Sequence, residues 1–87
     1  MNDRDRPILI TGVAGFIGAA LARKILDCNF KVVGLDNINS YYDRNLKLSR
    51  LKNIEKNLSR PGDWFFEKTS ITDKEKIRNI FLTYRPK

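Results

Sequence analysis

Residues 8–18 read Ile-Leu-Ile-Thr-Gly-Val-Ala-Gly-Phe-Ile-Gly, and the fold of the chain follows from this stretch. Its first four residues, Ile8–Thr11, form a short apolar run behind a proline, which is typical of a strand buried on both faces of a parallel sheet. Glycines then recur at every third position. A helix is predicted to begin near Gly15, because apolar residues beyond it recur at helical spacing. The predicted buried stripe of this helix consists of Ile17, Leu21, Ile25 and Cys28.

The rest of the chain continues the alternation of strand and helix. A second strand is predicted at residues 31–35, and Asp36 ends it where turn-forming residues begin. A second helix follows and ends before the Pro61-Gly62 pair, and a third strand is predicted at residues 64–69. The predicted buried stripe of the second helix consists of Leu48, Leu51, Ile54 and Leu58.

A capping box predicts the start of a third helix. Thr72 and Glu75 are spaced so that the side chain of each can bond the backbone N–H of the other. Pro86 ends this helix because it cannot donate a backbone hydrogen bond. Three strands that alternate with three helices predict an α/β fold around a parallel sheet with right-handed crossovers. The apolar positions of the third helix are Ile77, Ile80, Phe81 and Tyr84.

Composition and charge describe an ordinary globular protein. The 87 residues make one small domain at most, with 41% hydrophobic and 31% charged residues. A single cysteine, Cys28, and the absence of histidine exclude an internal disulfide and a zinc site, so no metal is predicted.

The basic residues favour no nucleic-acid or membrane partner. The net charge of +7 is spread thinly and no recognition motif accompanies it, so the basic side chains of the second helix are interpreted as a solvated face. The apolar run near the start imitates a signal peptide, but its regular glycines and the Arg23-Lys24 pair that follows favour a cytoplasmic protein.

The glycine-rich turn between the first strand and the first helix indicates a pyrophosphate site. Gly12 allows the tight turn, Gly15 lets the backbone approach the phosphates, and Gly18 lets the helix pack closely on the sheet. The unpaired N–H groups and the positive end of the helix then attract the anion. Glycines also mark plain turns, but here a strand precedes, a helix follows, and the acidic residue Asp36 ends the next strand.

Asp36 indicates which dinucleotide binds. Its carboxylate is placed to accept hydrogen bonds from the two hydroxyls of the adenosine ribose, and its charge would repel the 2′-phosphate of NADP. NAD is therefore the predicted cofactor. An alternative stays open, in which Asp36 only begins the turn into Asn37, because aspartate is common in such positions.

Two segments resemble a known family. The Thr-Gly-x-x-Gly-Phe-Ile-Gly pattern of residues 11–18 resembles the start of an extended short-chain dehydrogenase/reductase. Residues 34–43, followed by Leu46-Lys47 and Arg50-Leu51, closely resemble the UDP-glucuronate 4-epimerases, which are NAD-dependent nucleotide-sugar epimerases. The resemblance covers nearly the whole chain. It implies that residues 1–87 form the first, incomplete portion of a Rossmann domain, a doubly wound parallel sheet.

The resemblance also implies site residues. In that family the positions of Asp36 and Asn37 line the adenosine pocket, and the backbone at Phe16 and Ile17 faces the pyrophosphate. After the third strand the family usually has an acidic residue that accepts from the adenine amino group, and here that residue is Ser70, a weaker acceptor. Ser70 is equally compatible with an ordinary turn. The predicted cofactor-binding residues are Gly12, Gly15, Phe16, Ile17, Gly18, Asp36, Asn37, Ser70 and Ile71.

Catalysis in the resembled family requires a Tyr-x-x-x-Lys pair, which this sequence lacks. Tyr84 and Lys87 are three positions apart with Pro86 between them, so they cannot share a helix face. No catalytic residue is therefore predicted, and a UDP-sugar is expected to bind only together with a missing C-terminal part. The chain is expected to be a shortened form, a fragmentary gene product or the first part of a split protein. The alternative is a free-standing module that binds a nucleotide or a partner without catalysis.

Sheet order gives one further expectation. In the usual Rossmann order, 3-2-1-4-5-6, the first strand is central, but without a fourth strand it becomes an edge. Residues 8–10 are apolar and carry no charge, and such an edge invites pairing with another chain. Self-association through this edge is therefore predicted.

Overall fold

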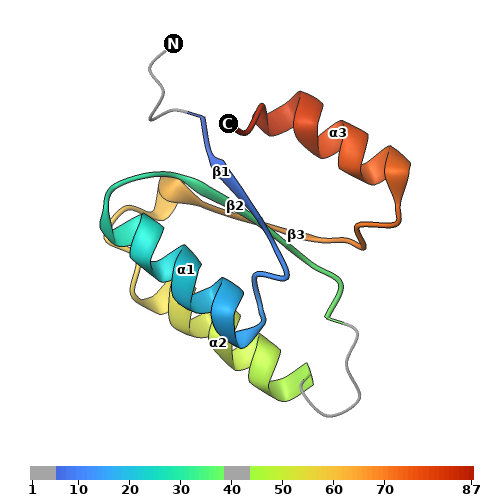
Figure 1. The fold of residues 1–87 in the computed structure, drawn as a ribbon. Coiled ribbons are helices and arrows are strands. Elements are labelled where there is room, and N and C mark those ends of the chain that lie inside the picture. The colour runs from blue at the N-terminus through green and yellow to red at the C-terminus, as the bar shows by residue number, and fades with distance from the viewer. Residues whose placement is uncertain (1–5, 39–43) are drawn as a thin grey trace.

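The structure is a computed structural model that describes residues 6–38 and 44–87. Its strands and helices alternate along the chain (Figure 1), which confirms the predicted α/β fold. The elements are β1 (Ile8–Thr11), α1 (Phe16–Asp27), β2 (Val32–Asp36), α2 (Arg44–Lys56), a short 3₁₀ helix η2 (Pro61–Asp63), β3 (Trp64–Lys68) and α3 (Lys74–Tyr84).

The three strands form one parallel sheet in the order β1-β2-β3. In its register Gly34 of the central strand lies between Ile10 of β1 and Phe66 of β3. All residues of β2 are buried, because this strand has a neighbour on each side and helices above and below. The order matches the 3-2-1 portion of a Rossmann sheet, and it places β1 at an edge of the sheet that the described residues form.

Helices cover both faces of the sheet (Figure 1). Helices α1 and α2 lie on one face and α3 lies on the other. Successive strand residues point to opposite faces, so Val32 and Trp64 pack with α1 and α2. Val33 and Leu35 pack on the other face with Ile80 of α3. The carboxyl ends of all three strands consequently meet at one end of this three-layered arrangement.

The buried face of α1 differs from the predicted stripe. Ala19 and Ala22 are the buried residues of this helix, whereas the side chains of Ile17 and Leu21 are 79% and 49% exposed. Ile25 is only partly buried against the core. Small residues face the sheet because the glycine turn brings the helix close to the strands, and this leaves no room for large side chains. The predicted stripe of α1 was therefore wrong.

The predicted stripe of α2 is confirmed at its centre. Leu51 and Ile54 are the buried residues of the helix, and Ile54 is only 1% exposed. Leu48 is 40% exposed. Leu58 lies beyond the end of the helix, where it packs partly buried against the same core.

The capping box predicted for α3 does not form. The helix begins one residue later, at Lys74, and its N-cap is Asp73, whose carboxylate accepts from the Lys76 N–H at 3.1 Å. The Thr72 hydroxyl instead lies 2.7 Å from the Ser70 hydroxyl. Aspartate is a favourable N-cap, and its negative charge complements the positive end of the helix. The helix was predicted correctly, but its cap was not.

Tyr84 fixes the last turn of α3 to β3. Its hydroxyl donates to Oε2 of Glu67 at 2.6 Å, and its ring centroid lies 5.2 Å from that of Phe65. Burial raises the pKa of Tyr84 from 10.0 to about 12, with help from the hydrogen bond to Glu67 and the charge of that carboxylate. The interaction therefore stabilises the fold below about pH 10, and its contribution is lost as the pH rises from about 10 to about 12.

We expect Tyr84 to ionise at a higher pH than an ordinary tyrosine. At about pH 11 an ordinary tyrosine is mostly ionised, whereas Tyr84 stays protonated. Tyr84→Phe should therefore leave the tyrosinate absorbance at that pH nearly unchanged, and Glu67→Gln should increase it. Circular dichroism serves as the control for folding. A clear loss of tyrosinate signal at this pH in folded Tyr84→Phe contradicts this contact.

Candidate functional site

The chain passes from β1 to α1 through a tight turn at Gly12–Gly15. Gly12 has a φ of 65°, a conformation that glycine adopts without steric cost, and its carbonyl accepts from the Gly15 N–H at 3.0 Å. The two residues between them, Val13 and Ala14, are completely buried. The Val13 N–H donates to the carbonyl of Leu35 at 3.1 Å. The turn is thus anchored both to itself and to β2.

The N-terminus of α1 opens directly after this turn. Its N-cap is Gly15, which has no side chain to accept from the first-turn N–H groups, so those groups and the positive helix end remain available to an anion. The first-turn side chains of Phe16 and Ile17 are 76% and 79% exposed. Gly18 lies against the turn, where a Cβ atom would come within 2.3 Å of the Gly12 carbonyl oxygen. Only glycine fits there.

Asp36, the last residue of β2, is held beside the turn and is only 5% exposed. Its Oδ2 accepts from the Ala14 N–H at 3.1 Å, and its Oδ1 accepts from the Ile38 N–H at 2.8 Å. Nζ of Lys47, in α2, lies 3.2 Å from the same Oδ1. The carboxylate therefore joins the glycine turn, the loop after β2 and helix α2. The hydrogen bond to Ile38 also shows that Asp36 begins a turn, as the alternative interpretation stated.

A cavity of about 330 Å³ opens at the carboxyl ends of the three strands. Ligands of open α/β sheets bind at this end of the strands. The predicted residues that line the cavity are Gly12, Asp36, Asn37, Ser70 and Ile71, and the other lining residues are Thr11, Leu35, Lys47 and Thr69. The remaining predicted residues, Gly15, Phe16, Ile17 and Gly18, do not line it and instead form the adjoining turn and the start of α1.

Ser70 takes part in a local turn at the rim of this cavity. Its hydroxyl accepts from the Thr72 N–H at 3.2 Å. The preceding Thr69 is 6% exposed, and its N–H donates to the carbonyl of Asp36 at 3.1 Å, which ties the loop after β3 to the end of β2. Ile71 beside it is 68% exposed. The contacts of Ser70 are those of a turn residue, and its position is at the cavity.

Two cations of α2 take part in the site, although the sequence interpretation assigned the basic residues of this helix to a solvated face. That interpretation was wrong for Lys47, which pairs with Asp36, and for Arg50, whose Nη1 donates to the Ala14 carbonyl at 3.2 Å. The Arg50 guanidinium also lies 5.9 Å from the ring centroid of Phe16. The two residues are three positions apart and so share a helix face. Lys52 and Lys56, four positions apart, share a face in the same way, so spacing and charge alone do not identify Lys47 and Arg50.

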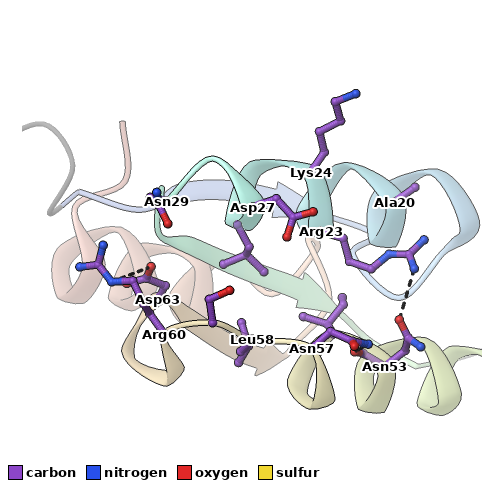
Figure 2. A pocket seen from close by; sticks show the side chains of 13 residues that line it. Ala20, Arg23, Lys24, Asp27, Asn29, Asn53, Asn57, Leu58, Arg60 and Asp63 are labelled. Atoms are coloured by element: carbon purple, nitrogen blue, oxygen red, sulfur yellow. Dashed lines mark hydrogen bonds and ion pairs between the residues drawn. The ribbon is translucent and has the colours of Figure 1, made fainter.

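A larger cavity, of about 530 Å³, lies between the C-terminal halves of α1 and α2 and the loop before β3 (Figure 2). Figure 2 shows Arg23 bonded to Asn53 across this cavity, at 3.2 Å, and Arg60 paired with Asp63 at 3.7 Å. These side chains thus bind one another. The cavity lies toward the amino ends of the strands, where no predicted motif lies, so the candidate site is the smaller cavity.

Within residues 6–38 and 44–87 there is no group of three side chains suited to hold a metal ion. No helix in this part of the chain is long and apolar enough to cross a membrane. Cys28 is an exposed free thiol.

Residues 9–87 match the family model described as GDP-mannose 4,6 dehydratase. The chain belongs to this family. Protein CapI of Staphylococcus aureus is 39% identical over 79 residues, which cover 91% of this chain and 22% of that protein. UDP-glucuronate 4-epimerase of Thermodesulfobacterium geofontis is 38% identical over 76 residues, which cover 87% of this chain and 22% of that protein. UDP-glucuronate 4-epimerase 4 of Arabidopsis thaliana is 35% identical over 74 residues, which cover 85% of this chain and 16% of that protein.

These relatives confirm the predicted resemblance to UDP-glucuronate 4-epimerases. This member of the GDP-mannose 4,6 dehydratase family spans about a fifth of the length of those relatives, between 16% and 22%. In this chain the glycine turn and the carboxyl ends of the parallel strands lie where open α/β sheets bind ligands. The cavity beside Asp36 is therefore the candidate ligand site of this family member.

In this family member we expect Gly18→Ala to lower the free energy of unfolding by about 1–3 kcal/mol, because the added methyl group overpacks the contact with Gly12. Gly62→Ala is the matched control, since nothing lies within 4 Å of the Cβ position there. Its effect should stay within about 0.5 kcal/mol. Urea unfolding followed by circular dichroism measures both. Equal stability of the two variants would show that α1 does not pack this closely against the turn.

Proposed function

We propose that this chain binds NAD in the cavity beside Asp36 and is the nucleotide-binding part of an NAD-dependent nucleotide-sugar 4-epimerase. The observation that carries the proposal is the meeting of Gly12, Asp36 and Ser70 in one cavity next to the N-terminus of α1. Membership of the GDP-mannose 4,6 dehydratase family supports a nicotinamide dinucleotide as the ligand.

The start of α1 is suited to the pyrophosphate. The backbone N–H groups of the first turn are not capped by Gly15, and they lie at the positive end of a 12-residue helix. Phe16 and Ile17 would contribute these N–H groups, while their side chains project to solvent. Gly18 keeps the helix close to Gly12, so the turn and the helix end form one surface for the phosphates.

The cavity is suited to the adenosine. Asp36 presents a charged acceptor at its floor, where the ribose hydroxyls would donate. Asn37 borders the same space, and Ser70 and Ile71 form the rim on which the adenine would lie. These residues bind and orient the dinucleotide. When bound, NAD supplies a reversible hydride acceptor for the sugar.

We extend the proposal to the activity of a larger protein. Two of the relatives are named UDP-glucuronate 4-epimerases, so UDP-glucuronate is the proposed substrate, and residues outside this chain would bind it and move its protons. A cytoplasmic location, inferred from the sequence pattern near the start, belongs to the same proposal. Self-association through the edge strand β1 stays a prediction.

We expect the unmodified chain to bind NAD more tightly than NADP, and Asp36→Ala to reduce that preference. Loss of the charged acceptor should weaken NAD binding by about 1–3 kcal/mol. Asp36 also holds the glycine turn, so the ratio of the two dissociation constants is the measurement, because partial unfolding weakens both equally. Calorimetry gives both constants, and Asp27→Ala in the larger cavity is the control. Equal affinity of the unmodified chain for both dinucleotides contradicts the assignment of NAD.

Ser70→Asp should tighten NAD binding by about threefold to tenfold, because a carboxylate is a stronger acceptor for the adenine amino group than a hydroxyl. One carboxylate oxygen can accept from the Thr72 N–H, as the Ser70 hydroxyl does, and the other can face the adenine. Ser59→Asp, at the larger cavity, controls for the added charge. Unchanged or weaker NAD binding in a folded Ser70→Asp variant means that Ser70 does not occupy the adenine-binding position.

A further inference from the structure

Lys47 brings a positive charge to the cavity beside Asp36. Its Nζ lies 3.2 Å from Oδ1 of Asp36, and the side chains of the two residues are only 17% and 3% exposed. Both residues line the candidate nucleotide site. A pair so shielded from water is screened weakly by salt, so the ammonium acts strongly on whatever enters the cavity.

The charge balance of the cavity differs from the balance that Asp36 alone would give. Among the described residues that line it, Asp36 and Lys47 are the two charged ones. Their charges cancel, so the lining does not repel an anion as an isolated aspartate would. Arg50, the next cation on the same helix face, is directed to the Ala14 carbonyl instead. The repulsion between Asp36 and the 2′-phosphate of NADP is therefore weakened by Lys47.

The hydrogen bonds of Asp36 determine where Lys47 must be when a dinucleotide is bound. Each carboxylate oxygen has about two acceptor positions. Oδ1 accepts from the Ile38 N–H and from Lys47, and Oδ2 accepts from the Ala14 N–H. A ribose with two free hydroxyls needs two positions, so Lys47 must leave Oδ1 for both to bind. Its flexible four-carbon stem allows this movement while the ammonium stays in the cavity.

We propose that Lys47 sets the cofactor specificity of this chain. Its ammonium competes with the ribose hydroxyls for Asp36, and it binds the 2′-phosphate when the ribose carries one, because lysine is an effective point charge for phosphate. This proposal rests on the proposed function, since it requires that the cavity bind the adenosine ribose. Lys47 thereby narrows the preference for NAD over NADP that Asp36 creates.

The test compares NAD and NADP binding to the chain and to Lys47→Met, which keeps an unbranched side chain of similar length and removes its charge. NADP should bind the variant about tenfold more weakly or worse, because a charge-assisted contact is lost. NAD should bind with affinity unchanged or up to about threefold higher, because Asp36 is released from its competitor.

Two further variants test whether the effect depends on a positive charge at position 47. Lys52→Met removes an exposed lysine of the same helix and should change neither dissociation constant. Lys47→Arg keeps the charge and should hold NADP affinity within about threefold of the unmodified chain. Circular dichroism and thermal unfolding verify that each variant is folded.

The failures of the two proposals are distinguishable. If the folded, unmodified chain binds neither dinucleotide, the proposed function is wrong, and the role of Lys47 is overturned with it. If the unmodified chain binds NAD but Lys47→Met weakens NAD and NADP by the same factor, or changes neither, the proposed function stands and Lys47 does not set specificity.

Discussion

The carboxylate of Asp36 joins three segments that are distant in the sequence. It accepts from the Ala14 N–H in the glycine turn, from the Ile38 N–H in the loop after β2, and from Lys47 in α2. The turn, Ile38 and the start of α2 are therefore all connected to the end of β2. The cavity at the carboxyl ends of the strands lies among these segments, so its shape depends on this one side chain. A buried carboxylate requires such partners, because an unpaired buried charge is costly.

The contacts that stabilise the site without a ligand are also the contacts that a ligand would replace. In the described part of the chain every buried side-chain oxygen and nitrogen has a hydrogen-bond partner. Asp36 meets this requirement through backbone N–H groups, which are fixed, and through Lys47, which can move. The fixed donors hold the carboxylate at the end of β2, and the movable donor occupies the position that ribose hydroxyls would need. On the proposed function, the carboxylate is thus already in place for a ligand that donates hydrogen bonds to it.

The sequence predicted the order of the elements and the place of the candidate site, but several side-chain directions depend on long-range packing. The apolar runs and the glycine turn identified β1, α1 and β2, because a short apolar run followed by a glycine turn and a helical repeat is typical of a strand that leads into a helix. Only β2 is fully buried, and β1 is partly buried with Thr11 exposed. In α1 two apolar stripes fit helical spacing, and only the close approach of the helix to the sheet selects Ala19 and Ala22 over the larger Leu21. The roles of Lys47 and Arg50 depend on which face of α2 meets the glycine turn, and charge alone does not reveal that.

Ile38 shows how far the influence of Asp36 extends along the chain. This residue has a φ of 55°, which is unfavourable for a β-branched side chain. The conformation persists because its N–H donates to Oδ1 of Asp36 at 2.8 Å. The residue is also only 7% exposed and packs in the core beneath α1 and α2. Strained backbone of this kind is kept where the surrounding contacts over-determine it. Asp36 and Asn37, the two residues before Ile38, line the cavity. A ligand that donates hydrogen bonds to the oxygens of Asp36 would compete with the Ile38 N–H and with Lys47 for them. Binding would therefore affect the conformation of Ile38 as well as the position of Lys47.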